Sequence, residues 1–243
     1  MVTSISVCMA TYNGTKTLPK QLESILSQLT AQDELIVVDD CSTDETITLL
    51  KKYTANFDGK VIIKKNDANC GPIKTFEKAM KWATKELIFL SDQDDQWHSD
   101  KVAVIKHQYE EKHADIIVHD AVVIGKTGKI IDESWNHYNR NQLNQSVIGN
   151  LMKNGYTGAM MAISNRLLKV ALPFPDTIEM HDQWLFLVAK KHHYPIVVVN
   201  DALMDYVRHG DNVTGMKKRS MKGMLTGRLK MLGAYIKIGG TSK

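Results

Sequence analysis

The sequence lacks the features that mark several large classes of protein. No apolar run approaches the ~20 residues that a membrane-spanning helix needs. The residues after Met1 alternate as a strand does and do not resemble a signal peptide. There is no linker rich in glycine, serine or proline, and no internal repeat. We therefore expect one continuous domain in a cytoplasmic protein.

Cysteine is also scarce, and two common phosphate-binding motifs are missing. The three cysteines, Cys8, Cys41 and Cys70, are odd in number and share no metal or redox spacing, so we interpret them as reduced thiols. The nine histidines show no zinc-helix pattern. Neither G-x-G-x-x-G nor G-x-x-x-x-G-K-[ST] occurs at a strand end. A phosphorylated ligand would therefore need another group to balance its charge.

Basic charge is concentrated at the end of the chain. No acidic residue occurs between Asn212 and Lys243, and the eight lysines and arginines there give this tail a charge of +8. In the tail, apolar residues recur at spacings of three and four, which is typical of one face of a helix. These apolar residues are Met221, Leu225, Leu229, Leu232 and Ile236, and the basic residues are Lys217, Lys218, Arg219, Lys222, Arg228, Lys230, Lys237 and Lys243.

A basic amphipathic helix over residues 216–243 has two interpretations. It can lie on the anionic inner face of the cell membrane as a peripheral contact, or it can pack on the body of the protein. Gly223, Gly227 and Gly233 lower its helix propensity, and Arg228 interrupts its apolar face. We favour the membrane interpretation and expect no nucleic-acid partner.

The first half of the chain alternates strands with helices. Apolar runs at 5–10, 35–38, 60–64 and 87–90 have the length of buried strands, and helical spacing separates them. This alternation predicts an α/β fold with a mostly parallel sheet and flanking helices. Ser42 with Glu45 three residues later forms a capping box, which predicts a helix starting at Ser42.

Three carboxylates follow the fourth predicted strand, at Asp92, Asp94 and Asp95. Ionised groups this close raise one another's pKa unless a cation lies among them or they fan out into water. A hard divalent ion, Mn²⁺ or Mg²⁺, prefers such oxygen ligands. The alternative is a solvated acidic turn that precedes a helix near Ser99. Because ligands bind at strand ends in open α/β sheets, we favour the metal site.

The second half predicts a smaller antiparallel extension. Strands are expected at 116–118, 121–124, 129–131 and 158–163, and the polar stretch 135–145 is expected to be a mobile loop over the site. Asp182 begins a helix after the break at Pro173-Phe174-Pro175. It is either a general base or an acid placed by the helix dipole.

Five short motifs occur in a fixed order along the chain. They are Thr11-Tyr12-Asn13-Gly14, Val37-Val38-Asp39-Asp40 with Ser42 and Asp44, Ser91-Asp92-Gln93-Asp94-Asp95-Gln96-Trp97, His181-Asp182-Gln183-Trp184, and Arg208-His209-Gly210-Asp211-Asn212-Val213-Thr214-Gly215. Together they resemble a family 2 glycosyltransferase with the GT-A fold, of the bacterial surface-polysaccharide, rhamnosyltransferase-like type. The resemblance covers Ser4 to Gly215.

The resemblance implies a GT-A catalytic domain over 1–215, with a nucleotide-sugar half at 1–97, an acceptor half at 98–215 and the basic tail at 216–243. It implies a metal-dependent, inverting transfer of one sugar from a UDP- or dTDP-sugar, with dTDP-rhamnose among the candidates, to a hydroxyl of a glycan or lipid-linked acceptor. The cofactor would be Mn²⁺ or Mg²⁺.

The resemblance also assigns roles to residues. Asp182 matches the catalytic base, and Asp94 and His209 match metal contacts, with Asp95 competing with Asp94 for the metal. The residues that match contacts to the nucleotide sugar are Thr11, Tyr12, Asn13, Asp40, Gly71, Asp92, Gln93 and Arg208. The residues that would border the sugar or acceptor are Trp97, His181 and Trp184.

Three other functions fit parts of the pattern. Asp92-Gln93-Asp94 resembles the nucleophile loop of haloacid-dehalogenase-type phosphatases, but that loop usually follows the first strand. A sugar nucleotidyltransferase would need a basic, glycine-rich loop near Thr11, and this loop is lacking. A binding or scaffold protein with the same fold would bind donor without turnover. His181 stands where many relatives have glutamate, and no Gln-x-x-Arg-Trp follows Trp184, so we expect addition of single sugars.

Overall fold

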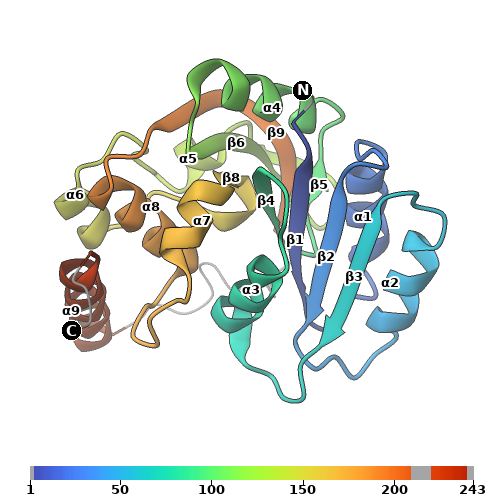
Figure 1. Cartoon of the computed structure of the whole chain (residues 1–243), viewed down its shortest axis with the longest axis horizontal. Coiled ribbons are helices and arrows are strands. Elements are labelled where there is room, and N and C mark those ends of the chain that lie inside the picture. Colours follow the sequence, from blue (N-terminus) through green and yellow to red (C-terminus); the bar gives the residue numbers. More distant parts are fainter. Residues whose placement is uncertain (1–2, 209–219, 240–243) are drawn as a thin grey trace.

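The structure is a computed structural model that describes residues 3–208 and 220–239. The predicted contacts at His209 and at 210–215, and the basic residues of 217–219, lie outside the described residues. Within these ranges nine strands form a single curled sheet (Figure 1). The order of eight of them is β3-β2-β1-β4-β8-β6-β9-β5, and β7 pairs with β6.

The first half forms the parallel part of the sheet, as the sequence predicts. β1 (Ile5–Thr11) lies between β2 (Glu34–Asp39) and β4 (Leu87–Ser91), and β3 (Lys60–Lys65) is the outer strand. All four strands run parallel. β2 and β4 are buried along their whole length, which explains their uninterrupted apolar sequences. The connecting helices are α1 (Leu18–Leu26), α2 (Thr46–Thr54) and α3 (Gly71–Lys81).

The register of these strands brings their polar ends together. Thr11 pairs with Asp39, and Met9 pairs with Ser91 two residues before β1 ends. The segments that follow β1, β2 and β4 therefore leave the sheet at the same edge. This is the edge at which open α/β sheets bind ligands.

The second half adds the antiparallel part, with one parallel pair. β8 (Met161–Ser164) runs antiparallel to both β4 and β6 (Ile116–Gly125), and β9 (Ile196–Arg208) runs parallel to β6. The short β5 (Gln96–Trp97) pairs with β9, which brings the segment after the acid cluster back to the sheet. The remaining elements are β7 (Ile130–Asp132), η1 (Gly158–Met160), α4 (Lys101–Lys112), α5 (Trp135–Tyr138), α6 (Val147–Met152), α7 (Asn165–Ala171), α8 (His181–Lys191) and α9 (Met221–Lys237).

Two local predictions are wrong. The strand expected at 158–163 begins as a 3-10 turn and becomes extended only at Met161. Helix α2 begins at Thr46 rather than at Ser42, and Glu45 makes no capping bond. The hydroxyl of Ser42 is used elsewhere, because it donates to Asp39 and accepts the backbone N–H of Asn13 at 2.8 Å.

The segment 135–145 does not begin as a mobile loop. Its first residues form α5, and the Trp135 side chain is buried. The Trp135 indole donates to the Thr157 hydroxyl at 2.9 Å and packs on the Tyr206 ring, with the ring centroids 4.4 Å apart. The aromatic residues that made this stretch resemble an exposed loop instead anchor it to β9.

The tail forms the expected helix, and this helix packs on the body. α9 lies against α6 and α8, at the edge of the molecule farthest from β3 (Figure 1). No helix within the described ranges is long and apolar enough to cross a bilayer.

Candidate active site

The acid cluster lies where β4 leaves the sheet. One carboxylate oxygen from each of Asp92, Asp94 and Asp95 lies within 4.8 Å of the others. Buried Gln21 of α1 fixes this strand end, since its amide nitrogen donates to the Ser91 hydroxyl at 2.7 Å and to the Asp92 carbonyl at 3.0 Å. The three side chains are therefore held together by the fold, as the sequence predicts.

Asp95 is the most deeply buried member of the cluster. Neither of its carboxylate oxygens has a well-formed hydrogen bond among the described residues. Burial, followed by the charges of Asp94 and Asp92, raises its pKa well above the ordinary value, while Lys101 and the backbone of Val207 act in the opposite direction. A buried carboxylate without good partners is costly, and a divalent cation would supply the missing interaction. The donor set therefore fits a hard metal ion.

The electrostatics of Asp92 connect the cluster to a second element. Burial raises the pKa of Asp92 to about 7, with smaller contributions from the charges of Asp94 and Asp182. Asp182 belongs to α8, far away in the sequence. The structure thus brings the predicted base and the predicted metal cluster into electrostatic contact.

Asp182 lies in the first turn of α8 and is held by neighbouring donors. Its Oδ1 accepts the Asn154 amide at 3.1 Å and the backbone N–H of Gln183 at 2.7 Å. Burial raises the pKa of Asp182, although His181 and these hydrogen bonds oppose the shift. A carboxylate with a raised pKa is better suited to accept a proton near neutral pH than an ordinary exposed one.

His181 fixes the start of α8 against the first half of the chain. Its ring stacks on Phe76 of α3, with the ring centroids 4.5 Å apart. Its Nε2 is buried and has no hydrogen-bond partner among the described residues, and burial lowers its pKa. A Cβ at Gly158 would lie 2.5 Å from this nitrogen, so only glycine leaves room for the ring.

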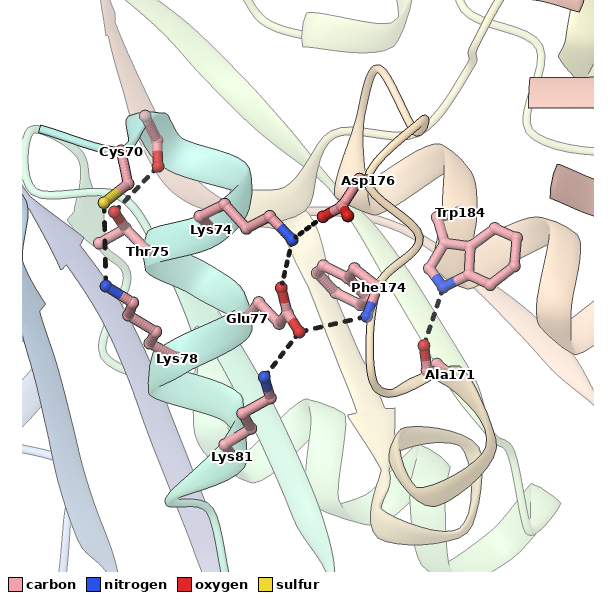
Figure 2. Close-up of polar contacts among 11 residues, drawn as sticks. Cys70, Lys74, Thr75, Glu77, Lys78, Lys81, Ala171, Phe174, Asp176 and Trp184 are labelled. Carbon is pink, nitrogen blue, oxygen red and sulfur yellow. Dashed lines mark hydrogen bonds and ion pairs between the residues drawn. The ribbon is translucent and has the colours of Figure 1, made fainter. Parts of the chain in front are cut away.

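The segment that precedes α8 is tied to α3 by a buried carboxylate. Glu77 accepts from Lys74 at 3.2 Å, from Lys81 at 2.7 Å and from the backbone N–H of Phe174 at 3.3 Å (Figure 2). Lys74 and Lys81 belong to α3 itself, and the bond to Phe174 joins α3 to the segment before α8. Trp184 is not brought to the site. Its indole is buried and donates to the Ala171 carbonyl at 2.9 Å, so it packs in the core.

The turn after β1 is clamped by Gln93 of the acid loop. The Gln93 amide accepts the backbone N–H of Tyr12 and donates to the Tyr12 carbonyl, each at 2.9 Å. Tyr12 itself is 47% exposed. The Thr11 hydroxyl points inward and donates to Asp39 at 3.0 Å, and the Asn13 side chain accepts from Thr43. Tyr12 and Asn13 are the exposed residues of this turn, whereas Thr11 and Gly14 are buried.

Asp40 organises the loop before α3. Its carboxylate accepts the Asn66 amide and the backbone N–H groups of Cys70 and Gly71, each at 2.8 Å. Burial acts to raise the pKa of Asp40, but these three hydrogen bonds outweigh it and lower the pKa. The Thr75 hydroxyl acts on the pKa of Asp40 in the same direction, so donors surround this carboxylate. Gly71 has a φ of +78°, which explains glycine at this turn.

Arg208 ends the described part of β9. Its guanidinium carbon lies 5.7 Å from the centre of the Tyr138 ring. Trp97 borders the acid cluster, but its side chain is buried and its indole N–H has no hydrogen-bond partner among the described residues. Trp97 therefore packs beneath the surface next to the acid cluster and does not line an open pocket.

Comparison with known proteins identifies the family of this chain. The sequence model of Glycosyl transferase family 2 matches residues 6–171, which is more than half of the chain. This chain belongs to family 2 of the glycosyltransferases. The GT-A fold is confirmed by solved structures. TarS of Staphylococcus aureus, residues 1–349 in complex with UDP-GlcNAc, superimposes with a TM-score of 0.74 over 98% of this chain and 68% of that chain, at 20% identity.

Two further comparisons extend this result. The putative teichuronic acid biosynthesis glycosyltransferase TuaG of Bacillus subtilis is 22% identical over 90% of this chain and 84% of its own length. A mannosyltransferase from Pyrobaculum calidifontis, solved with GDP-Man and Mn²⁺, has a TM-score of 0.63 at 17% identity, over 97% of this chain and 70% of that chain. The chain spans a third or less of the length of the first curated relatives that it matches.

Lys101 is a residue of this family 2 site that the motifs did not reveal. Its side chain is buried, and its ammonium donates to the Ala159 carbonyl at 3.1 Å and lies 4.2 Å from the centre of the Trp97 ring. Burial lowers its pKa to about 7, while Asp95 and Asp92 act to raise it. It is the nearby cation that offsets part of the cluster's charge. The one hint in the sequence was its position a few residues after the three acids, where a lysine could offset their charge.

The raised pKa of Asp92 predicts a pH-dependent stability in metal-free protein. Between about pH 4 and pH 7 the folded protein retains a proton on Asp92 that the unfolded chain has lost. The free energy of unfolding therefore falls as the pH rises through this range. Asp92→Asn is expected to raise the melting temperature at pH 8 by roughly 4–8 °C, equivalent to about 2 kcal/mol, and to change it little at pH 5.

Thermal melts in EDTA at both pH values check this prediction. Asp58→Asn, an exposed acid in the loop before β3, is the matched control and should melt like the parent protein. An equal gain for Asp92→Asn at pH 5 and pH 8 would show that the shift does not come from ionisation.

Proposed function

We propose that this chain is a metal-dependent, inverting glycosyltransferase that moves one sugar from a UDP- or dTDP-sugar to a hydroxyl of a glycan or lipid-linked acceptor. The observation that carries the proposal is the acid cluster after β4, in which one carboxylate oxygen from each of Asp92, Asp94 and Asp95 lies within 4.8 Å of the others. Asp182 of α8 is near enough for its charge to contribute to the raised pKa of Asp92. One site would thus hold both the proposed base and the proposed cation ligands. The proposed metal-dependent, inverting transfer uses this combination.

The residues at the edge of the parallel sheet support a binding site for the nucleotide sugar. Asp40 follows β2 and the Tyr12 turn follows β1, at the same edge of the sheet. The carboxylate of Asp40 would accept the N3–H donor that uracil and thymine share. Gln93, next to Asp92, is hydrogen-bonded to this turn. These contacts do not distinguish the two bases, so dTDP-rhamnose and UDP-sugars are both donors to test.

Asp94 and Asp95 are the proposed ligands of Mn²⁺ or Mg²⁺, with Asp94 as the main one. When bound, the cation would neutralise the negative charge that develops on the leaving diphosphate. The burial of Asp95 excludes water from the back of the cluster. Lys101, when protonated, would offset part of the negative charge of the cluster.

Asp182 is the proposed general base. It would accept the proton of the acceptor hydroxyl as that oxygen attacks the sugar from the face opposite the leaving diphosphate. Asn154 orients the carboxylate through its 3.1 Å hydrogen bond, and the stacking of His181 on Phe76 fixes the first turn of α8. One base suffices, because inversion needs no covalent intermediate on the protein.

A thermal-shift panel of nucleotide sugars, with and without Mn²⁺, tests the proposal. A donor at 100 times its dissociation constant stabilises the folded state by about 2.7 kcal/mol. We therefore expect a UDP- or dTDP-sugar to raise the melting temperature by roughly 5–10 °C with Mn²⁺, and by less in EDTA. GDP- and ADP-sugars are the matched controls.

The outcome of this panel also separates the alternatives. The absence of any shift with all pyrimidine nucleotide sugars would contradict the proposed donor site. A shift without turnover of any donor, with water or with acceptor sugars, would favour a binding or scaffold protein. Release of phosphate from simple phosphate esters would favour a phosphatase.

A further inference from the structure

Helix α9 has two apolar faces, and only one of them packs on the body. Its buried residues recur at spacings of four, three and four and face α6 and α8. They are Gly227, Met231 and Ala234, together with Ile238 directly after the last residue of the helix. The opposite face carries the residues whose spacing predicted the amphipathic helix. These four, the apolar stripe, are Leu225, Leu229, Leu232 and Ile236, which are 58%, 60%, 39% and 67% exposed.

Helix α6, which packs beside α9, also exposes apolar side chains. Ile148 and Met152, one helical turn apart, are 75% and 56% exposed. The Arg228 guanidinium of α9 donates to the Met152 carbonyl at 2.7 Å, which joins the two helices at this point. Six of the twelve large exposed apolar side chains in the described ranges lie on α6 and α9. This concentration differs from the scattered exposure that is normal on protein surfaces.

Positive charge flanks the apolar stripe. Lys222 and Lys237 of α9 are exposed, and Arg228 lies on its other side. Lys230 lies nearer the body, where it pairs with Glu179 at 3.2 Å. No acidic residue occurs in α9 or anywhere from Asn212 to Lys243. The surface of α9 therefore combines exposed leucines and an isoleucine with positive charges and has no acidic residue of its own.

We propose that the exposed faces of α6 and α9 dock on a bilayer that contains anionic lipids. Apolar side chains in the middle of a helix face, with lysines at its borders, suit insertion at the boundary of headgroups and acyl chains. A second copy of this chain fits less well, because two such faces would bring cations against cations. The docking surface does not depend on the proposed function.

The position of the surface adds a consequence for the acceptor. α8 carries Asp182 and packs on α9, and α6 is followed by Asn154, which binds Asp182. Docking would therefore place the base side of the site near the bilayer. If the proposed function holds, this arrangement fits an acceptor whose sugar is attached to a lipid.

Flotation with lipid vesicles tests the docking surface in the 243-residue chain, without nucleotide or metal. We expect binding to vesicles of phosphatidylcholine with phosphatidylglycerol, and weaker binding to phosphatidylcholine alone. Leu225→Ser with Leu229→Ser should lower the partition coefficient by at least about tenfold. Lys222→Gln and Lys237→Gln should each lower it by about fivefold at low salt. The matched control is Ile130→Ser with Ile131→Ser, which alters two similarly exposed residues of β7.

Two results would overturn the proposal. One is equal vesicle binding by the parent chain and by Leu225→Ser with Leu229→Ser (the leucine variant). Equal binding of the parent chain to anionic and to neutral vesicles would count in the same way. The other is a dimer in sedimentation velocity that the leucine variant dissociates, together with no vesicle binding by the parent chain. Unchanged melting and nucleotide binding in the leucine variant would show that it folds. Vesicle binding without any nucleotide affinity would leave the docking surface intact and contradict only the proposed function.

Discussion

Replacing Asp182 with asparagine is expected to lower sugar transfer by about 10²–10⁴-fold, which is the usual contribution of a positioned general base. The asparagine side-chain oxygen can still accept the Asn154 amide, so the geometry of the first turn of α8 should persist. The amide cannot take a proton from an acceptor hydroxyl. The loss should therefore fall on turnover, and the dissociation constant of the donor should stay within about twofold.

Steady-state transfer and calorimetric donor binding, measured on the same preparations, check this prediction. Asp58→Asn, an equally conservative change at an exposed acid, should transfer at the parent rate. Unchanged transfer in Asp182→Asn would remove the base assignment. A parallel loss of donor binding would mean that Asp182 serves the donor and not the acceptor.

If the proposed function holds, the parent protein should hydrolyse its nucleotide sugar slowly in a Mn²⁺-dependent reaction. Replacing Asp94 with asparagine is expected to lower the rate of this hydrolysis by at least about 100-fold. A bound cation typically stabilises developing negative charge by several kcal/mol, and the variant removes its proposed main ligand. Asp92 and Asp95 would remain within the cluster. Mn²⁺ should then no longer raise the melting temperature of the nucleotide-bound protein.

The same assay with Asp95→Asn separates the two candidate ligands. If Asp95 is mainly the buried support of the cluster, its variant should retain a Mn²⁺ response that Asp94→Asn lacks. The reverse pattern would make Asp95 the main ligand. Full hydrolysis in both variants would contradict a cation site at this strand end.

The sequence predicted the part of the fold that positions the donor side. β2 and β4 are buried on both faces, so their apolar runs were uninterrupted and easy to recognise. Parallel pairing follows from the intervening helices, and it places the residues after β1, β2 and β4 at one edge of the sheet. The acid cluster at this edge was therefore predictable from local pattern alone.

The features that the sequence did not reveal depend on contacts between distant segments. Nothing local to Lys101 indicates that Trp97 and Ala159 enclose it. The hydroxyl of Ser42 bonds to Asp39 and to the backbone of Asn13. These hydrogen bonds replace the helix cap that the local sequence predicts. Helical spacing found the exposed stripe of α9 but missed its packed face, because Gly227 and Ala234 carry little hydrophobic signal.

The central claim is that the carboxylates at the end of β4 bind a cation and, through it, the diphosphate of an activated sugar. Calorimetric titration of UDP and of dTDP, in Mn²⁺ and in EDTA, tests it most directly. We predict that Mn²⁺ tightens the binding of at least one of them by about tenfold or more, equivalent to about 1.4 kcal/mol. Equal affinity in Mn²⁺ and EDTA, or no affinity for either nucleotide, would contradict the claim.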